Sequence, residues 1–237
     1  MSFLVVEGSQ SVRELLCYAL LSHGVKGTPV ATRTAAWEVL SSRKDITGAI
    51  IDIDTQEAEG SELIEEMKGK DETRRIPIIV HTVQANKEFV MKMIESGVAG
   101  YLLKPFREDT AHAKLAAILD KLSDHNVQRK HIRVKPGPDD VIRVHFRLPS
   151  ISQLISGKIV DISLGGIAME LFNPPDSKAF PTGGRIGKLQ FALGPRELAP
   201  SAIIVMFKGN LLAVRFETLN PQDKTTLQRF IFKKISL

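Results

Sequence analysis

Five residues in the second half of the chain combine side chains that could bind an anionic ligand with polar edges. Arg129 and Arg133 lie four positions apart in a basic run, and Asp161, Ser163 and Gly166 follow in the pattern D-x-S-x-x-G. An arginine fork donates to O6 and N7 of guanine together, stacks on a purine or bridges phosphate oxygens. Asp161 only accepts when ionised, which suits the N1–H and N2–H₂ donors that distinguish guanine from adenine. Ser163 adds a hydroxyl, and Gly166 allows a positive φ or a close approach of backbone to base. The set is compatible with a phosphorylated purine ligand, and the clustered arginines predict an anionic partner.

A second group of polar residues follows short apolar segments of the first half. Glu7, Asp52, Thr82 and Lys104 each stand at the end of such a segment. One interpretation is structural: Lys104 pairs with Asp52 and holds a pocket shut, and Thr82 is a strand-end hydroxyl. Asp54 is offset from Asp52 by two residues, and we expect it to face elsewhere.

The elements that must position the second group are predicted by alternating patterns. Short apolar runs predict buried parallel strands over 3–6, 49–51, 76–80 and 101–103. Helical spacing predicts helices over 12–20, 35–40, 61–70, 87–96 and 109–122, the first ended by Gly24. Strands alternating with helices predict a doubly wound, flavodoxin-like α/β domain, in which functional residues gather beyond the carboxyl ends of the strands.

The second half has a different pattern, with little helix before its end. Alternating polarity predicts strands over 141–146, 157–161, 167–172, 188–193, 202–207 and 211–216. Gly209-Asn210 between two apolar runs predicts a tight hairpin. Asn220 as N-cap and Pro221 at the first helical position predict a final helix. We therefore expect a small six-stranded antiparallel β-barrel with a C-terminal helix.

Charge is divided unevenly between the two halves. Residues 1–124 hold 15 basic against 19 acidic residues, a net −4, and residues 125–237 hold 17 against 8, a net +9. This division predicts two domains, 1–124 and 125–237, with an anionic partner for the second. A single cysteine, Cys17, excludes an internal disulfide framework. Neither a secretory signal nor an apolar run long enough to cross a bilayer is visible, so a cytoplasmic location and no membrane insertion are expected.

Residues 3–122 resemble the receiver domain of two-component response regulators. The resemblance rests on Leu4-Val-Val-Glu7, Ile51-Asp52, Gly60, Thr82 and Lys104-Pro105-Phe106. It implies that the residue at Asp52 takes a phosphoryl group from a histidine kinase. It also implies that the residues at Thr82 and Lys104 coordinate phosphoryl oxygens, and that an acidic pair after the first strand helps to hold Mg²⁺.

The sequence departs from the receiver pattern at the acidic pair, which is Glu7-Gly8, and Gln56 replaces a usual proline. Mg²⁺ usually needs one or two carboxylates beside a phosphate, and phosphoryl transfer without metal loses charge neutralisation. We therefore favour a degenerate phosphoacceptor pocket in a domain used for docking, with no cofactor and no firm Mg²⁺ at Asp52. A receiver that is still phosphorylated at Asp52 is the alternative.

Residues 128–235 resemble PilZ domains. The resemblance rests on the Arg129/Arg133 run followed by Asp161-Ile-Ser163-Leu-Gly165-Gly166 on a barrel pattern. It implies binding of cyclic di-GMP, which carries two guanines and two phosphates, through Arg129, Arg133, Asp161, Ser163 and Gly166. A solvated linker and an Asx-type turn are the structural alternatives for the two motifs, and His131 is expected to be an exposed linker side chain.

These features favour a cyclic di-GMP-binding signalling effector, in which the ligand fixes the Arg loop and reorients the receiver-like domain. A downstream protein partner is expected, and the receiver-like domain is one surface that could bind it. The alternative is a phosphorylation-controlled regulator whose basic second domain binds nucleic acid. The chain lacks a helix-turn-helix pattern, which disfavours nucleic acid. An enzyme is not expected, because no catalytic set, metal-binding cluster or cofactor fingerprint is visible.

Overall fold

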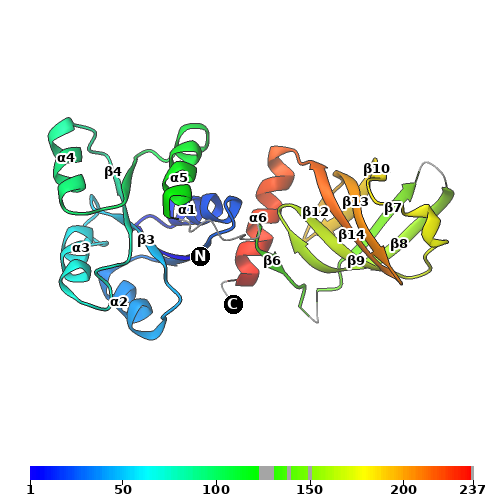
Figure 1. Ribbon diagram of the computed structural model, residues 1–237, viewed down its shortest axis with the longest axis horizontal. Helices are drawn as coiled ribbons and strands as arrows, with labels where there is room; N and C mark the ends of the chain where they lie inside the picture. Colours follow the sequence, from blue (N-terminus) through cyan, green and yellow to red (C-terminus); the bar gives the residue numbers. More distant parts are fainter. Residues whose placement is uncertain (123–130, 138–139, 149–150, 236–237) are drawn as a thin grey trace. The chain divides into compact units, whose positions relative to one another are not determined.

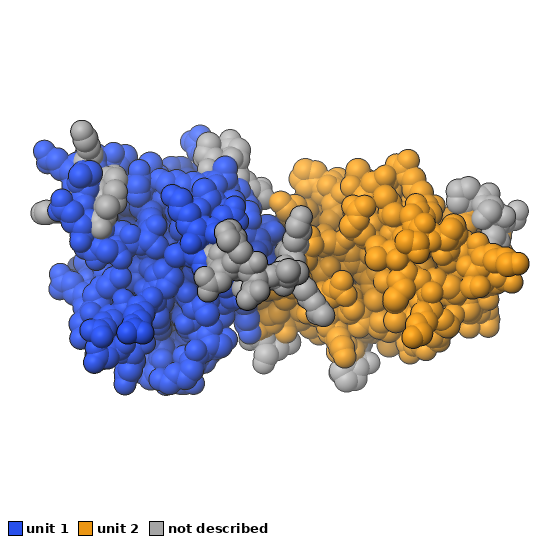
Figure 2. Space-filling view, in the orientation of Figure 1, with its two compact units in different colours: residues 1–129 blue, residues 130–237 orange. Residues whose placement is uncertain are grey.

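The computed structural model describes residues 1–122, 131–137, 140–148 and 151–235. The chain forms two compact units, Met1–Arg129 and Lys130–Leu237 (Figure 2). The predicted boundary at 124/125 and the predicted ligand residue Arg129 lie outside the described residues. None of the described helices combines the length and the hydropathy that crossing a bilayer requires.

The first unit is a parallel sheet covered by helices on both faces (Figure 1). Its strand order is β2(Lys26–Val30), β1(Ser2–Val6), β3(Gly48–Asp52), β4(Ile78–Thr82) and β5(Gly100–Leu103). The helices between them are α1(Gln10–Ser22), α2(Arg33–Ser42), α3(Gly60–Gly69), α4(Lys87–Glu95) and α5(Glu108–Leu122). The predicted flavodoxin-like, doubly wound fold is therefore confirmed.

The core of this unit follows from its apolar strands. Every residue of β1, β3 and β4 is buried, as expected for central parallel strands covered on both faces. Strand β2 was not predicted, because its sequence Lys-Gly-Thr-Pro-Val lacks an apolar run. It forms at the edge of the sheet, where Pro29 is tolerated because one side of the strand needs no partner.

The second unit is a sheet of nine mostly short antiparallel strands. They are β6(Arg133–Val134), β7(Arg143–Leu148), β8(Ile151–Ser163), β9(Gly166–Leu171), β10(Arg185–Ile186), β11(Leu189–Leu193), β12(Arg196–Leu198), β13(Ser201–Lys208) and β14(Leu211–Thr218). The order is β10-β13-β14-β9-β8-β7-β11-β12, and β6 pairs with β8. Strand β10, at one end of this order, contacts β7 near the other end, so the sheet curls on itself as a barrel.

The six predicted barrel strands all exist as β7, β8, β9, β11, β13 and β14. The prediction of six strands is too low, because β6, β10 and β12 have only two or three residues and give no alternating pattern. Strand β8 is also longer than predicted, with 13 residues, because its register with β7 continues down to Ile151. The Gly209-Asn210 hairpin joins β13 to β14 as predicted.

The last helix, α6(Pro221–Ile235), begins where the sequence predicts. The N–H of Asp223 donates to Asn220 Oδ1 at 2.8 Å, which satisfies one of the free N–H groups of the first turn. Leu227 and Ile231 are fully buried against the sheet. The helix contacts β6, β8 and β11 and so covers the strands that carry the predicted ligand residues.

Candidate functional sites

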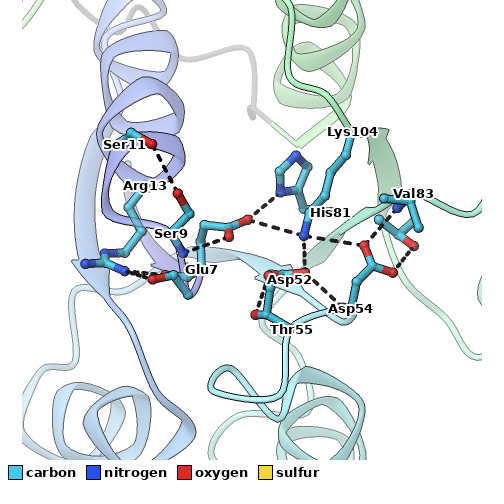
Figure 3. Close-up of polar contacts among 12 residues, drawn as sticks. Glu7, Ser9, Ser11, Arg13, Asp52, Asp54, Thr55, His81, Val83 and Lys104 are labelled. Carbon is cyan, nitrogen blue, oxygen red and sulfur yellow. Dashed lines mark hydrogen bonds and ion pairs between the residues drawn. The ribbon is translucent and has the colours of Figure 1, made fainter.

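The carboxyl ends of β1, β3 and β5 bring Glu7, Asp52 and Lys104 together (Figure 3). Lys104 Nζ lies 2.5 Å from Asp52 Oδ1, 3.6 Å from Glu7 Oε2 and 3.4 Å from Asp54 Oδ2. The side chain of Asp52 is fully buried, and that of Lys104 is 16% exposed. The pocket is therefore a nearly closed cluster in which one ammonium faces three carboxylates.

Asp52 has both carboxylate oxygens engaged. Oδ1 accepts from Lys104 and from the N–H of Asp54 at 2.9 Å, and Oδ2 accepts from the hydroxyl of Thr55 at 2.6 Å. Burial alone would raise the pKa of Asp52, but the bonds from Lys104, Thr55 and the Asp54 N–H together hold it below its usual value. Burial alone would lower the pKa of Lys104, but the bond from Asp52 and the nearby carboxylates raise it. Asp52 is thus held as an ionised carboxylate.

Gly60 allows the start of α3 to pack closely against the backbone of Asp52. A Cβ atom at Gly60 would lie 1.9 Å from the carbonyl oxygen of Asp52, so only glycine fits where α3 begins. The sequence match at Gly60 therefore marks a close approach of backbone to backbone.

Glu7 is held by a partner that sequence reasoning did not assign. Its Oε2 lies 2.9 Å from His81 Nδ1, and its Oε1 accepts from the N–H of Ser9 at 3.1 Å. The side chains of His81 and Glu7 are 0% and 2% exposed. The signal that could have found this pair is a histidine inside the apolar run of β4, since a buried imidazole needs a polar partner.

The prediction that Asp54 faces elsewhere is wrong. Its Oδ1 accepts from the hydroxyl of Thr82 at 2.8 Å, and its Oδ2 accepts from the N–H of Val83 at 2.8 Å. Strand β3 ends at Asp52, and the bond from the Asp54 N–H to the Asp52 carboxylate turns the loop back over the strand end. Thr82 is therefore bonded to a side chain, not only to its local backbone.

The donor set in this pocket does not fit Mg²⁺ as it is arranged. Glu7 is bonded to His81 and Ser9, Asp54 to Thr82 and Val83, and the Lys104 ammonium lies among all three carboxylates. Gly8 itself supplies no carboxylate, and a Cβ at this position would lie 2.9 Å from Thr55 Oγ1 and 3.5 Å from Glu57 Oε2. Over the part of the chain that the structure describes, no group of three or more His, Cys, Asp or Glu side chains could hold a metal ion.

In the barrel, the structure places Arg133 beside Asp161. Strand β6 pairs with β8 so that Arg133 is opposite Ser163 and Val134 is opposite Ile162. A register shift between Ile159 and Asp161 interrupts the pairing of β8 with β9 at this point. Arg133 Nη1 then lies 3.8 Å from Asp161 Oδ2, with side chains 57% and 27% exposed. Both groups are accessible, and their separation leaves each able to bind a further polar partner.

Ser163 and Gly166 form the turn between β8 and β9. The hydroxyl of Ser163 donates to the carbonyl of Gly166 at 3.1 Å and accepts from the N–H of Gly165 at 3.3 Å. A Cβ at Gly166 would lie 2.1 Å from the carbonyl oxygen of Val214, so the close approach observed is to strand β14. Ser163 and Gly166 therefore shape the turn that carries Asp161.

His131 is not the exposed linker side chain that was expected. It is partly buried, and a Cβ at Gly165 would lie 2.4 Å from its Cδ2 atom. Its ring thus rests on the turn between Ser163 and Gly166. Glycine at position 165 leaves the room for this ring.

A groove of about 680 Å³ opens elsewhere on the barrel, between β7, the β11–β12 hairpin and α6. Its lining includes Arg143, His145, Gln190, Glu197 and Phe230. Arg133, Asp161, Ser163 and Gly166 do not line it. The groove is therefore distinct from the surface where the two motifs meet, and shape alone does not identify the ligand site.

Two family models match the chain. Residues 3–116 match the response regulator receiver domain, and residues 128–233 match the PilZ domain. Chemotaxis protein CheY1 of Helicobacter pylori is 29% identical over 120 residues, which are 50% of this chain and 97% of that protein.

Solved structures resemble each unit separately. CheY4 of Vibrio cholerae has a TM-score of 0.45 and 20% identity, covering 52% of this chain and 98% of that one. The PilZ domain of YcgR from Escherichia coli, solved with c-di-GMP, has a TM-score of 0.39 and 20% identity, covering 46% of this chain and 92% of that one. The assignment rests on the two family matches and the folds described above: the chain consists of a response regulator receiver domain followed by a PilZ domain.

Proposed function

We propose that the protein is a cyclic di-GMP-binding signalling effector. The observation that carries the proposal is the meeting of Arg133 and Asp161, 3.8 Å apart and both accessible, at the β8–β9 turn of a PilZ domain. These residues belong to two motifs that are well separated in the sequence, and the pairing of β6 with β8 brings them together.

The chemistry of this pair suits a guanine dinucleotide. The Asp161 carboxylate would accept from N1–H and N2–H₂ of a guanine, and the Arg133 guanidinium would donate to O6 and N7 or to a phosphate. Arg129, which belongs to the same motif in the sequence, would supply a second guanidinium. Ser163 and Gly166 would act through the turn, because their own contacts hold it in shape. In this proposal the protein needs no cofactor to bind the ligand and carries out no catalytic step.

The receiver domain would then transmit the signal by docking. Both oxygens of Asp52 are engaged, and the acidic pair lacks one carboxylate at Gly8, which disfavours use of this pocket for phosphoryl transfer. We infer that the dianionic ligand draws Arg129 against the PilZ domain beside Arg133, which the pairing of β6 with β8 already holds there. This would change the orientation of the receiver domain toward a downstream protein partner.

Titration calorimetry on the full chain with cyclic di-GMP tests the proposal. The wild-type protein should bind, and Arg133→Ala should weaken binding about tenfold or more, since a charge-assisted bond to a buried phosphate or base is lost. Arg143→Ala, on β7 and outside both motifs, is the matched control and should bind like the wild type. Absence of binding by the wild type, or equal losses in both variants, would overturn the proposal.

A further inference from the structure

The Asp54 carboxylate is surrounded by three different donors from the ends of two strands. Thr82 is the last residue of β4, Val83 follows it, and Lys104 follows β5. The Thr82 hydroxyl and the Val83 N–H each donate at 2.8 Å, to different oxygens of the carboxylate, and Lys104 Nζ lies 3.4 Å away. A hydroxyl, a backbone N–H and an ammonium that converge on one anion are the components of an oxyanion-binding site.

We propose that Thr82, Val83 and Lys104 form an oxyanion site that Asp54 permanently fills. The side chain of Asp54 thereby takes the position that an external anion would need, and the pocket is complete without one. This inference concerns the receiver domain and does not depend on the binding of cyclic di-GMP by the PilZ domain.

Charge and access both support an internal occupant. The cluster already contains the carboxylates of Glu7, Asp52 and Asp54 around one Lys104 ammonium, so a further anion would add to an excess of negative charge. The side chain of Asp52 is fully buried, whereas that of Asp54 is 18% exposed. An anion that arrives from solvent would therefore meet Asp54 before it reached the pocket.

The occupied site also ties the loop after β3 to the segment after β4. Asp54 donates its N–H to Asp52 and accepts from Thr82 and Val83, and the N–H of Gln84 donates to Thr82 Oγ1 at 3.1 Å. Removal of the Asp54 carboxylate would leave the Val83 N–H and the Thr82 hydroxyl without this acceptor. The segment 82–84 is thus held in one arrangement by the chain itself, whether or not a phosphodonor is present.

Residue-resolved amide exchange on the full chain tests this inference. In Asp54→Ala the Val83 amide should exchange about tenfold faster than in the wild type, because its charged acceptor is gone. Asp54→Asn, which keeps one carbonyl oxygen, should show a smaller acceleration. Glu57→Ala, an exposed acidic residue of the same loop, is the matched control and should leave Val83 unchanged. Unchanged protection of β1 and β3 amides shows that each variant is folded.

Sodium formate distinguishes an oxyanion site from a simple loop contact. A small carboxylate should occupy the vacated position in Asp54→Ala and slow Val83 exchange toward the wild-type rate, whereas sodium chloride at the same ionic strength should not. Formate should not affect the wild type, whose site is filled. Equal Val83 exchange in Asp54→Ala and the wild type, or an acceleration that formate does not reverse, would overturn the proposal.

Discussion

Lys104 is the residue on which the electrostatics of the receiver pocket depend. Its ammonium faces the carboxylates of Glu7, Asp52 and Asp54, and its own pKa is raised by them against the effect of burial. Asp52, with its lowered pKa, binds fewer protons in the folded chain than in the unfolded chain. Its contribution to stability is therefore present above the ordinary aspartate pKa of about 3.9 and is lost as the pH falls through the lower, folded value.

Replacement of this lysine should reverse the pH dependence. In Lys104→Met the buried Asp52 would face Glu7 and Asp54 with no cation, which raises the pKa of Asp52 above its unfolded value. The free energy of unfolding should fall by about 3–5 kcal/mol at neutral pH and should increase, not decrease, as the pH is lowered from about 7 to 4. Urea unfolding followed by Trp37 fluorescence measures this. Exposed Lys44→Met is the control, and the same slope in both variants would contradict the prediction.

Phosphorylation of Asp52 gives a second prediction for single residues. Acetyl phosphate with Mg²⁺ should leave Asp52 of the wild-type chain unphosphorylated, as measured by mass spectrometry. Gly8 supplies no carboxylate for the metal, and the Asp54 carboxylate already contacts the Thr82 hydroxyl and the Lys104 ammonium. Gly8→Asp alone should not restore labelling, whereas Gly8→Asp combined with Asp54→Ala should. Stoichiometric labelling of the wild type would show that the pocket is competent as it stands.

Residue types and spacing predicted that Glu7, Asp52 and Lys104 lie together, but not that His81 and Asp54 join them. The grouping of Glu7, Asp52, Thr82 and Lys104 follows from strand ends meeting at one edge of a parallel sheet. The orientation of Asp54 cannot be predicted from the positions of the strand ends, because it depends on a loop that folds back after β3 ends. Periodicity describes residues inside strands and helices and carries no information about a loop of this kind.

At the scale of elements, apolar patterning predicted the long strands and all six helices. It missed β2, β6, β10 and β12, which form because a neighbouring strand offers hydrogen-bond partners and not because their own residues favour a strand. Strand β6 matters most among these. Its two residues bring Arg133 to Asp161, so the candidate ligand site depends on a pairing that local sequence does not reveal.

Gly166 tests the role of the β8–β9 turn. In Gly166→Ala the new Cβ would lie 2.1 Å from the Val214 carbonyl, so β9 and β14 must separate and the free energy of unfolding should fall by about 1–3 kcal/mol without any ligand. Gly187→Ala is the control, since no atom lies within 4 Å of its added Cβ. Differential scanning calorimetry of the ligand-free chain measures both. Equal stability of the two variants would contradict this prediction and would indicate that Gly166 is required only for ligand binding.

For the whole molecule, we expect the binding of cyclic di-GMP to change the shape of the chain in solution. We expect the basic residues of segment 129–135 to repel one another without ligand, and a dianionic ligand to neutralise that repulsion. Cyclic di-GMP should therefore protect residues 126–136 from hydrogen exchange and change the small-angle scattering profile of the full chain. If the nucleotide binds but neither hydrogen exchange nor the scattering profile changes, the predicted reorientation of the receiver domain is wrong.

We propose that the PilZ domain recognises guanine through Asp161, and calorimetry with two cyclic dinucleotides measures this selectivity. Cyclic di-GMP should bind the full chain at least about tenfold more tightly than cyclic di-AMP, because the Asp161 carboxylate would face the N1 acceptor of adenine. Asp161→Asn should narrow this difference, since an amide can donate to that acceptor. Equal affinity of the wild-type chain for the two dinucleotides would contradict the account.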